Sequence, residues 1–234
     1  MNFRTINKFR KAHRFLGLFI GIQFLFWTLS GLYFSWTNLD EIHGDHYLKN
    51  PKKKAFDSLI AIDSIENRSE FSIEALELKS IGGQPYFWIN NDFLVHAKTG
   101  NKLDFISKKQ AAEIVRENVL DLYSIEKIER IDSVSNHDEY RGKPLPAFKV
   151  WLNGNGNPIA YVSMRDGGFQ KIRHRQWRWF DFLWMTHTMD YEGRDNFNTL
   201  ILRVFSLLGL ITVLSGFALA FVTSRRRRKK TIKS

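Results

Sequence analysis

Histidines are the residues of this chain whose type and spacing point to chemistry. There are seven, and two of them, His43 and His46, form a His-x-x-His pair. Imidazoles at this spacing can bind a metal ion, but a typical zinc site has a third protein ligand that the pair alone does not provide. Two more, His13 and His187, lie at the borders of apolar segments. These four histidines are the candidate ligands, and the apolar segments must position them.

The sequence lacks the motifs of the common enzyme classes. It has no cysteine, which excludes disulfides, thiolate chemistry and cysteine-ligated metals. No nucleophile elbow, zinc-protease motif, phosphate-binding loop, or flavin or nicotinamide fingerprint occurs. A redox function would therefore take its electrons from a separate donor. His96, His137 and His174 lie in polar sequence, and we expect them to be solvated.

Two apolar segments have the length of membrane spans. Phe15–Thr37 comprises 23 residues and Val204–Ser224 comprises 21, and neither contains a charged side chain. A helix rises about 1.5 Å per residue, so each segment can cross a hydrocarbon layer of roughly 30 Å. The first segment is too long for a signal peptide and is not followed by a cleavage site of small residues. We therefore predict two transmembrane helices, at 15–37 and 204–224.

The net charge of +11 is concentrated in the two tails. Residues 1–14 carry five basic side chains and residues 225–234 carry seven, and neither tail contains an acid. Basic residues beside a span mark its cytoplasmic end. We therefore expect cytoplasmic tails that contact the lipid bilayer, and an extracytoplasmic domain at 38–203. That domain is almost neutral, so nucleic acid is not an expected partner.

The segment between the spans has the pattern of an α+β domain. Ser107 and Gln110 form a capping box at the start of a helix. Gln84–Val95 contains apolar residues on both sides of a turn at residues 90–92, which predicts an antiparallel hairpin. Runs of β-branched and aromatic residues predict a meander of further strands, at 125–134, 147–152, 159–164 and 169–172.

An aromatic segment at residues 177–189 follows this domain. It is rich in Trp and Phe, but its 13 residues are too few to span a bilayer. Amphipathic aromatic rings prefer the headgroup region of a membrane. We expect an interfacial helix, which would place His187 at the extracytoplasmic membrane surface.

Two parts of the chain resemble the PepSY-associated transmembrane family. The stretch from Ile106 to Arg173, a helix followed by strands that include Tyr161-Val162-Ser163, is similar to a PepSY domain. The motif His13-Arg14-Phe15-Leu16-Gly17-Leu18, with Leu29-Ser30-Gly31 further along, is similar to the opening of the family's first membrane helix. The chain departs from larger members in having two spans and in having Phe15 where Trp is frequent.

The resemblance implies the fold class and the location. The chain is expected to be an α+β membrane protein in which two transmembrane helices flank an extracytoplasmic PepSY-like domain, built of a helix and an antiparallel sheet. The expected location is the bacterial inner membrane, with both termini cytoplasmic and the central domain periplasmic.

The resemblance also implies haem b, because relatives in iron uptake are associated with histidine-held haem and with reduction of ferric siderophores. The candidates here are His13, His187, His43 and His46. The first span is about 35 Å long, so His13 and His187 are too far apart to bind one iron. A haem near the periplasm would use His187 with His43 or His46. A haem near the cytoplasm would use His13 from each of two copies.

Small residues in the spans provide faces on which two copies can associate. Gly17 and Gly21 form a Gly-x-x-x-Gly motif, which allows close approach of helices. Leu29-Ser30-Gly31 in the first span is echoed by Leu214-Ser215-Gly216 in the second. We expect a homodimer through the Gly17/Gly21 face, whose four helices would form a bundle.

Two functions follow from these features. In the first, the chain is a two-pass inner-membrane protein of iron uptake that presents a PepSY-type accessory domain to a periplasmic peptide, protein or siderophore. In the second, it is a dimeric haem b electron-transfer protein that reduces ferric iron or ferric siderophores. The first is favoured by the architecture, and the second explains why His13 and His187 lie at membrane boundaries.

Overall fold

The computed structural model describes residues 3–50, 54–65 and 68–231. The chain forms two compact units. The helix unit contains the residues up to Thr37 and those from Phe180 onward, and the sheet unit contains Asn38–Trp179. The prediction of a central domain flanked by two long apolar helices is confirmed.

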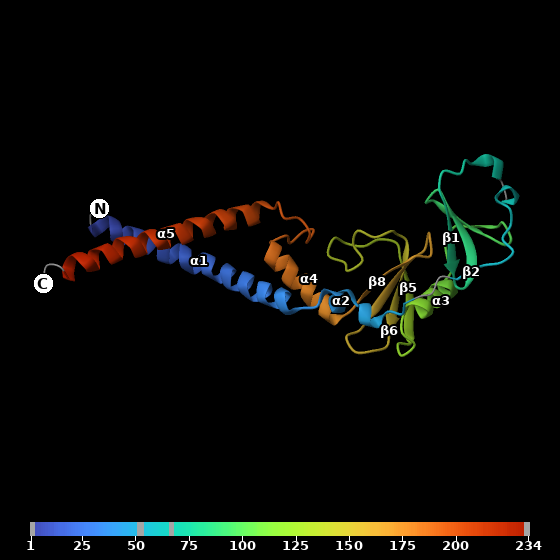
Figure 1. Cartoon of the computed structure of the whole chain (residues 1–234), viewed down its shortest axis with the longest axis horizontal. Coiled ribbons are helices and arrows are strands. Elements are labelled where there is room, and N and C mark those ends of the chain that lie inside the picture. The colour runs from blue at the N-terminus through green and yellow to red at the C-terminus, as the bar shows by residue number, and fades with distance from the viewer. Residues whose placement is uncertain (1–2, 51–53, 66–67, 232–234) are drawn as a thin grey trace. The chain divides into compact units, whose positions relative to one another are not determined.

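The helix unit is built on two long helices, α1 (Phe3–Trp36) and α5 (Leu200–Thr231). Figure 1 shows α1 and α5 alongside each other, with the start of α1 and the end of α5 at the same end of the pair. Both helices are long and apolar enough to cross a membrane. Many of their apolar side chains are exposed, as with Phe15 at 74% and Leu200 at 75%, which is compatible with a lipid environment.

The expected basic tails are largely helical. The first tail belongs to α1 from Phe3 onward, because no proline or glycine interrupts the sequence before Gly17. The second continues α5 as far as Thr231. Residues 1–2 and 232–234 of these tails lie outside the described residues. The predicted aromatic helix is α4 (Arg175–Thr188), which begins two residues before the predicted start and ends one residue before the predicted end.

The first sheet of the sheet unit is an antiparallel meander in the order β1-β2-β3-β4. The predicted hairpin is confirmed, and Asn90 and Asn91 adopt positive φ angles of 52° and 57° in its turn. Two strands of this sheet were not predicted. One mixes leucines with charged residues and lacks a β-branched run, and the other comprises only two residues. The strands are β1 (Leu76–Ile81), β2 (Gln84–Ile89), β3 (Phe93–His96) and β4 (Lys102–Leu103).

The second sheet follows the predicted meander, in the order β5-β6-β7-β8. Before it comes α3 (Lys108–Asn118), whose capping box between Ser107 and Gln110 is confirmed. Figure 1 shows α3 and these strands in one part of the sheet unit. The strands are β5 (Ile125–Ile131), β6 (Ala147–Leu152), β7 (Ile159–Ser163) and β8 (Phe169–Arg173).

The second sheet is covered on both faces. On one face Val150 and Val162 join the main core, where Ile114 and Val115 of α3 are also buried. On the other face Tyr161 joins a smaller cluster with Tyr140, from the connection between β5 and β6. The sheet is therefore a layer between α3 and a long loop. The short helical segments before the first sheet are α2 (Leu39–His43), η1 (Asp45–Tyr47), η2 (Ile62–Ser64) and η3 (Arg68–Glu70).

Candidate histidine sites

His13 of α1 is held by a serine of α5. Its Nδ1 lies 2.7 Å from the Oγ of Ser215. That hydroxyl also lies 2.8 Å from the backbone oxygen of Thr212, one turn earlier in the helix. Next to it, a Cβ built on Gly216 would lie 3.3 Å from the imidazole Cε1 of His13, so the glycine lets the ring approach the helix backbone closely. We call His13, Ser215 and Gly216 the His13 site.

His187 of α4 is held in the same way by α1. Its Nδ1 lies 2.7 Å from the Oγ of Ser30, and that hydroxyl lies 2.7 Å from the backbone oxygen of Phe26. A Cβ built on Gly31 would lie 3.9 Å from the imidazole Cε1. The Nε1 of Trp27 donates to the backbone oxygen of His187 over 2.7 Å, which ties the end of α4 to α1. We call His187, Ser30 and Gly31 the His187 site.

The serines determine which ring nitrogen of each histidine is free. A hydroxyl has one hydrogen, and a backbone carbonyl can only accept. At 2.7–2.8 Å from a carbonyl oxygen, the hydroxyls of Ser30 and Ser215 must direct that hydrogen to the carbonyl. Each Oγ therefore accepts from Nδ1–H of its histidine. In the neutral ring this arrangement puts the lone pair on the Nε2 of His13 and of His187, which is the form that binds a metal.

The two sites repeat the same local sequence. Each serine and glycine belong to one copy of the Leu-Ser-Gly echo, at Leu29-Ser30-Gly31 and Leu214-Ser215-Gly216. His13 and Ser30 are separated by 17 residues of α1, which corresponds to about 26 Å along the helix. The two imidazoles therefore belong to separate sites and cannot bind one metal ion.

His43 and His46 lie in the sheet unit, and both are exposed. His43 ends α2, and Gly44 follows it in the left-handed conformation with a φ of 89°. The ring of His46 packs on Tyr47 with a centroid distance of 4.1 Å. The predicted pairing of His187 with one of these histidines would join the two units and stays a prediction. Among the described residues, no group of three or more His, Asp or Glu side chains could hold a metal ion.

The prediction that His174 is solvated is wrong. Its side chain is 1% exposed, and its Nε2–H donates to the backbone oxygens of Glu41 at 3.0 Å and Ile42 at 3.2 Å. Burial lowers the pKa of His174 below its ordinary value. The missed signal is the alternation that continues from β8, where Ile172 and His174 both point inward.

The other two histidines occupy different environments. His137 is exposed, as predicted. His96 is half-buried, and its ring lies edge-on to Tyr86 with a centroid distance of 4.9 Å. Neither belongs to the His13 site or the His187 site, so both serve as control positions for substitution.

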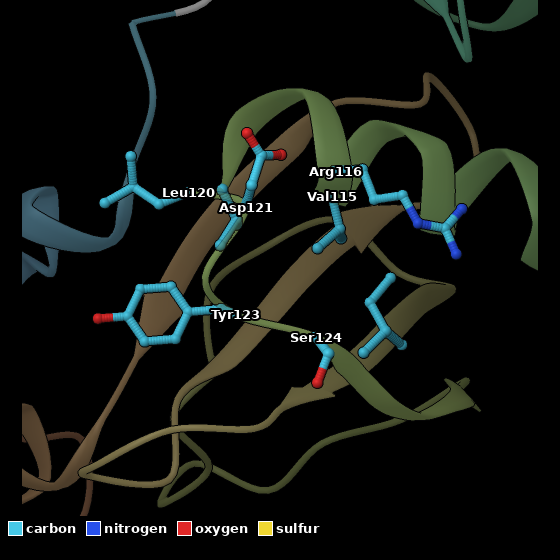
Figure 2. A pocket seen from close by; sticks show the side chains of 8 residues that line it. Val115, Arg116, Leu120, Asp121, Tyr123 and Ser124 are labelled. Carbon is cyan, nitrogen blue, oxygen red and sulfur yellow. The ribbon is translucent and has the colours of Figure 1, made fainter.

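The sheet unit contains a cavity of about 350 Å³. Figure 2 shows its lining side chains, which come from the end of α3, from the start of β5 and from the connection between them. Lys49 lies beside it and pairs with Asp121 over 2.6 Å. The lining is mixed in polarity and consists of Val115, Arg116, Val119, Leu120, Asp121, Tyr123, Ser124 and Ile125.

Comparison with protein-family models, curated proteins and solved structures finds no match to this chain. The PepSY resemblance therefore remains a hypothesis from the sequence. The function has to be inferred from the geometry of the chain's own residues, of which the two histidine sites are the most specific.

Proposed function

We propose that this chain is a haem b electron-transfer protein that works as a homodimer in the bacterial inner membrane. The observation that carries the proposal is the pair of matched histidine sites, in which Ser215 and Ser30 leave the Nε2 of His13 and His187 free to bind iron. Neutral imidazole with a hydrogen-bonded Nδ1–H is the usual axial ligand of haem iron. Haem b, when bound, supplies a centre that takes up and releases one electron.

At each site the chain provides one of the two histidine ligands that a haem b would need. Each site as defined contains one histidine, whereas a haem held by two imidazoles would need a second one. A second copy of the chain can supply it, as predicted for His13. Because the His187 site repeats the His13 site, we propose the same arrangement there, with His187 from both copies. His43 or His46 as the partner of His187 is the alternative.

The Gly17/Gly21 face supports association of two copies. A Cβ built on either glycine would meet no atom within 4 Å, so packing within the chain does not require glycine there. Glycine inside a helix costs about 1 kcal/mol relative to alanine. His13, Gly17 and Gly21 follow one another at intervals of four residues along α1, so they lie on the same side of the helix. We propose that the second copy approaches on this side.

The separation of the two sites fits transfer across a bilayer. About 26 Å along α1 is close to the thickness of the hydrocarbon layer, so the sites would lie near opposite membrane surfaces. The basic tails favour cytoplasmic termini, which would put the His13 site near the cytoplasm. We propose ferric iron or ferric siderophores in the periplasm as the acceptor and a separate protein as the donor.

A dithionite-reduced minus oxidised spectrum of the purified full chain tests the proposal. We expect the α-band of a b-type haem in protein from cells supplied with a haem precursor. His13→Ala and His187→Ala should each remove about half of the signal, and the exposed control His137→Ala should leave it unchanged. Absence of the band in the unaltered protein would refute the proposal, and retention of full signal in both variants would refute the ligand assignment.

Two further variants identify the partner of His187. If His187 pairs with its counterpart in the second copy, His43→Ala and His46→Ala keep both haems. Loss of one haem in either variant would instead show that the sheet unit provides the ligand. Gly21→Ile should lower both the haem content and the dimer fraction in neutral detergent, because its branched side chain prevents close helix approach.

A second candidate function is favoured by the cavity in the sheet unit. Its volume of about 350 Å³ and its mixed lining suit part of a small ligand or a peptide side chain. The chain would then present a PepSY-type binding domain. Calorimetric titration of the full chain with a trihydroxamate siderophore and its ferric complex tests this. Ser124→Trp, which places an indole beside the cavity, should abolish binding, whereas the distant Ser135→Ala should not.

A further inference from the structure

One face of the second sheet carries an excess of positive charge over aromatic rings. Lys149 of β6 lies over the rings of Trp151 and Tyr161, at 5.2 and 5.9 Å from their centroids. Lys171 and Arg173 of β8 are two residues apart and therefore share this face. The loop residue Tyr140, which stacks on Tyr161 at 4.7 Å, belongs to the same surface. This is the face opposite α3.

Arg173 is the most constrained of these cations. Its guanidinium carbon lies 4.2 Å from the ring centroid of Trp177, and that of Arg141 lies 5.8 Å from the same ring. The Nη1 of Arg173 donates to the backbone oxygen of Ile172 at 3.2 Å, and its Nε is buried without a hydrogen-bond partner. A guanidinium has five N–H donors, so most of the hydrogen-bonding capacity of Arg173 is unused within the described residues.

Lys171 is also partly buried and lies 5.6 Å from the ring centroid of Tyr140. In the described part of the chain, neither Lys171 nor Arg173 forms an ion pair with a carboxylate. Burial, followed by the charges of Arg173, Lys143 and Arg141, lowers the pKa of Lys171 to about 7. Burial likewise lowers the pKa of Arg173 to about 10. The charge of Glu139 offsets only part of each shift.

Glu139, the carboxylate whose charge acts on both Lys171 and Arg173, already accepts hydrogen bonds from other residues. Its oxygens accept from the Nε of Arg178 at 2.8 Å and from the hydroxyl of Tyr161 at 2.7 Å. Burial alone would raise the pKa of Glu139, but these two hydrogen bonds hold it below its ordinary value. Glu139 therefore remains ionised and its direct partners are Arg178 and Tyr161. Its charge acts on Lys171 and Arg173 from a distance, but within the described residues neither cation has a carboxylate in direct contact.

We propose that Lys171 and Arg173 form a binding site for an oxyanion, with the rings of Tyr140 and Trp177 as its walls. Lys171 and Arg173 are partly buried, share a strand face and have no direct carboxylate partner within the described residues. A carboxylate, phosphate or phenolate ligand would neutralise their charge, and the planar guanidinium can bind such a group through two hydrogen bonds. The proposal goes beyond electron transfer and does not depend on haem.

The oxyanion can come from two sources. It can belong to a soluble compound, such as citrate or an anionic ferric chelate, or to the phosphate of an anionic lipid. Trp177, which forms one wall, belongs to the aromatic segment that we expect at a membrane surface, so the lipid source is included in the test. Both sources present the same chemistry to Lys171 and Arg173.

Calorimetric titration of the full chain in neutral detergent tests the site. The probes are citrate, ferric citrate and inorganic phosphate, and a parallel titration uses micelles doped with phosphatidylglycerol. We expect saturable binding of at least one probe, which Lys171→Met and Arg173→Met weaken about tenfold each, since each removes a charge-assisted hydrogen bond. Binding of the soluble probes identifies a soluble ligand, and binding of the doped micelles alone identifies a lipid.

Lys127→Met is the matched control, because Lys127 lies on the same face 4.8 Å from the ring of Trp151 but pairs with Glu129 over 2.8 Å. It should bind the probes as the unaltered protein does. Arg173→Lys keeps the charge but not the planar donor pair, so its affinity for the probe should lie between those of the unaltered protein and of Arg173→Met. An intermediate affinity would also show that the loss in Arg173→Met is not due to misfolding. No binding of any probe by the unaltered protein, or an equal loss in Lys127→Met, would overturn the proposal.

Discussion

A serine hydroxyl lies next to His13 and another next to His187, and each accepts from Nδ1–H of its ring. In both sites the hydroxyl donates to a carbonyl of its own helix and accepts from Nδ1–H, so that in the neutral ring Nε2 carries the lone pair. Hydrogen bonds of this kind orient a ligating imidazole and raise its basicity. The free Nε2 is a property of the histidine and serine together, and it could not be read from either residue alone.

Removing the hydroxyl of Ser30 or of Ser215 should change the midpoint potential of one of the two proposed haems and leave the other unchanged. Ser30→Ala and Ser215→Ala each leave an Nδ1–H without its acceptor, which makes the imidazole a weaker donor to iron. We expect each substitution to raise the midpoint potential of about half of the haem signal and to lower haem retention, as measured by potentiometric titration of the purified protein. Ser35→Ala is the control, because that hydroxyl donates to the backbone oxygen of Leu32 at 2.8 Å and belongs to neither histidine site. Equal shifts in all three variants would contradict this role.

Lys171 should make stability depend on pH. Its pKa is about 7 in the folded protein against an ordinary value of 10.5, so between these values the unfolded chain binds a proton that the folded chain does not. Stability should therefore rise as the pH rises from about 7 towards 10.5. Thermal denaturation of the full chain at pH 6.5, 8 and 9.5 should show this rise, and Lys171→Met should reduce it. A Lys171→Met protein with the same pH dependence as Lys127→Met would contradict the assignment.

At the scale of elements, α3 shows how local sequence sets a boundary. The hydroxyl of Ser107 accepts from the backbone N–H of Gln110 at 3.3 Å, and the Oε1 of Gln110 accepts from the backbone N–H of Ser107 at 2.8 Å. The strands β6 and β7 likewise begin at the predicted residues, because their β-branched and aromatic runs are bounded by turn-forming residues. β1 was missed because its partner β2 stabilises it, and that pairing leaves no β-branched signature in its sequence.

Loss of the cap should destabilise the sheet unit. Ser107→Ala removes an acceptor for a backbone N–H at the start of α3, which typically costs about 1 kcal/mol. We expect faster proteolysis within the sheet unit of the full chain at a fixed temperature. Ser135→Ala, at an exposed loop position, should be cleaved at the rate of the unaltered protein. Unchanged cleavage of the Ser107→Ala protein would show that the cap contributes little.

At the scale of the whole molecule, the proposed orientation can be tested directly because the chain has no cysteine. Single cysteines at the exposed positions Lys8 and Asn136 report on the first helix and on the sheet unit. A membrane-impermeant maleimide should label Asn136→Cys in spheroplasts and Lys8→Cys only after permeabilisation. The reverse pattern would place the sheet unit in the cytoplasm and would contradict the orientation inferred from the basic tails.

Features that depend on neighbouring residues could be predicted from the amino-acid sequence. Charge-free runs of membrane length, basic tails, a capping box and short β-branched runs are all local patterns, and they predicted α1, α5, α3 and the second sheet. Tertiary structure alone brought Ser215 to His13 and Ser30 to His187, across 202 and 157 residues of chain. It also buried His174, which local polarity had suggested was solvated. The physical reason is that a hydrogen bond between side chains far apart in the sequence depends on how the helices pack. The spacing of residues within the histidine segment or within the serine segment does not show which residues of the two helices will meet.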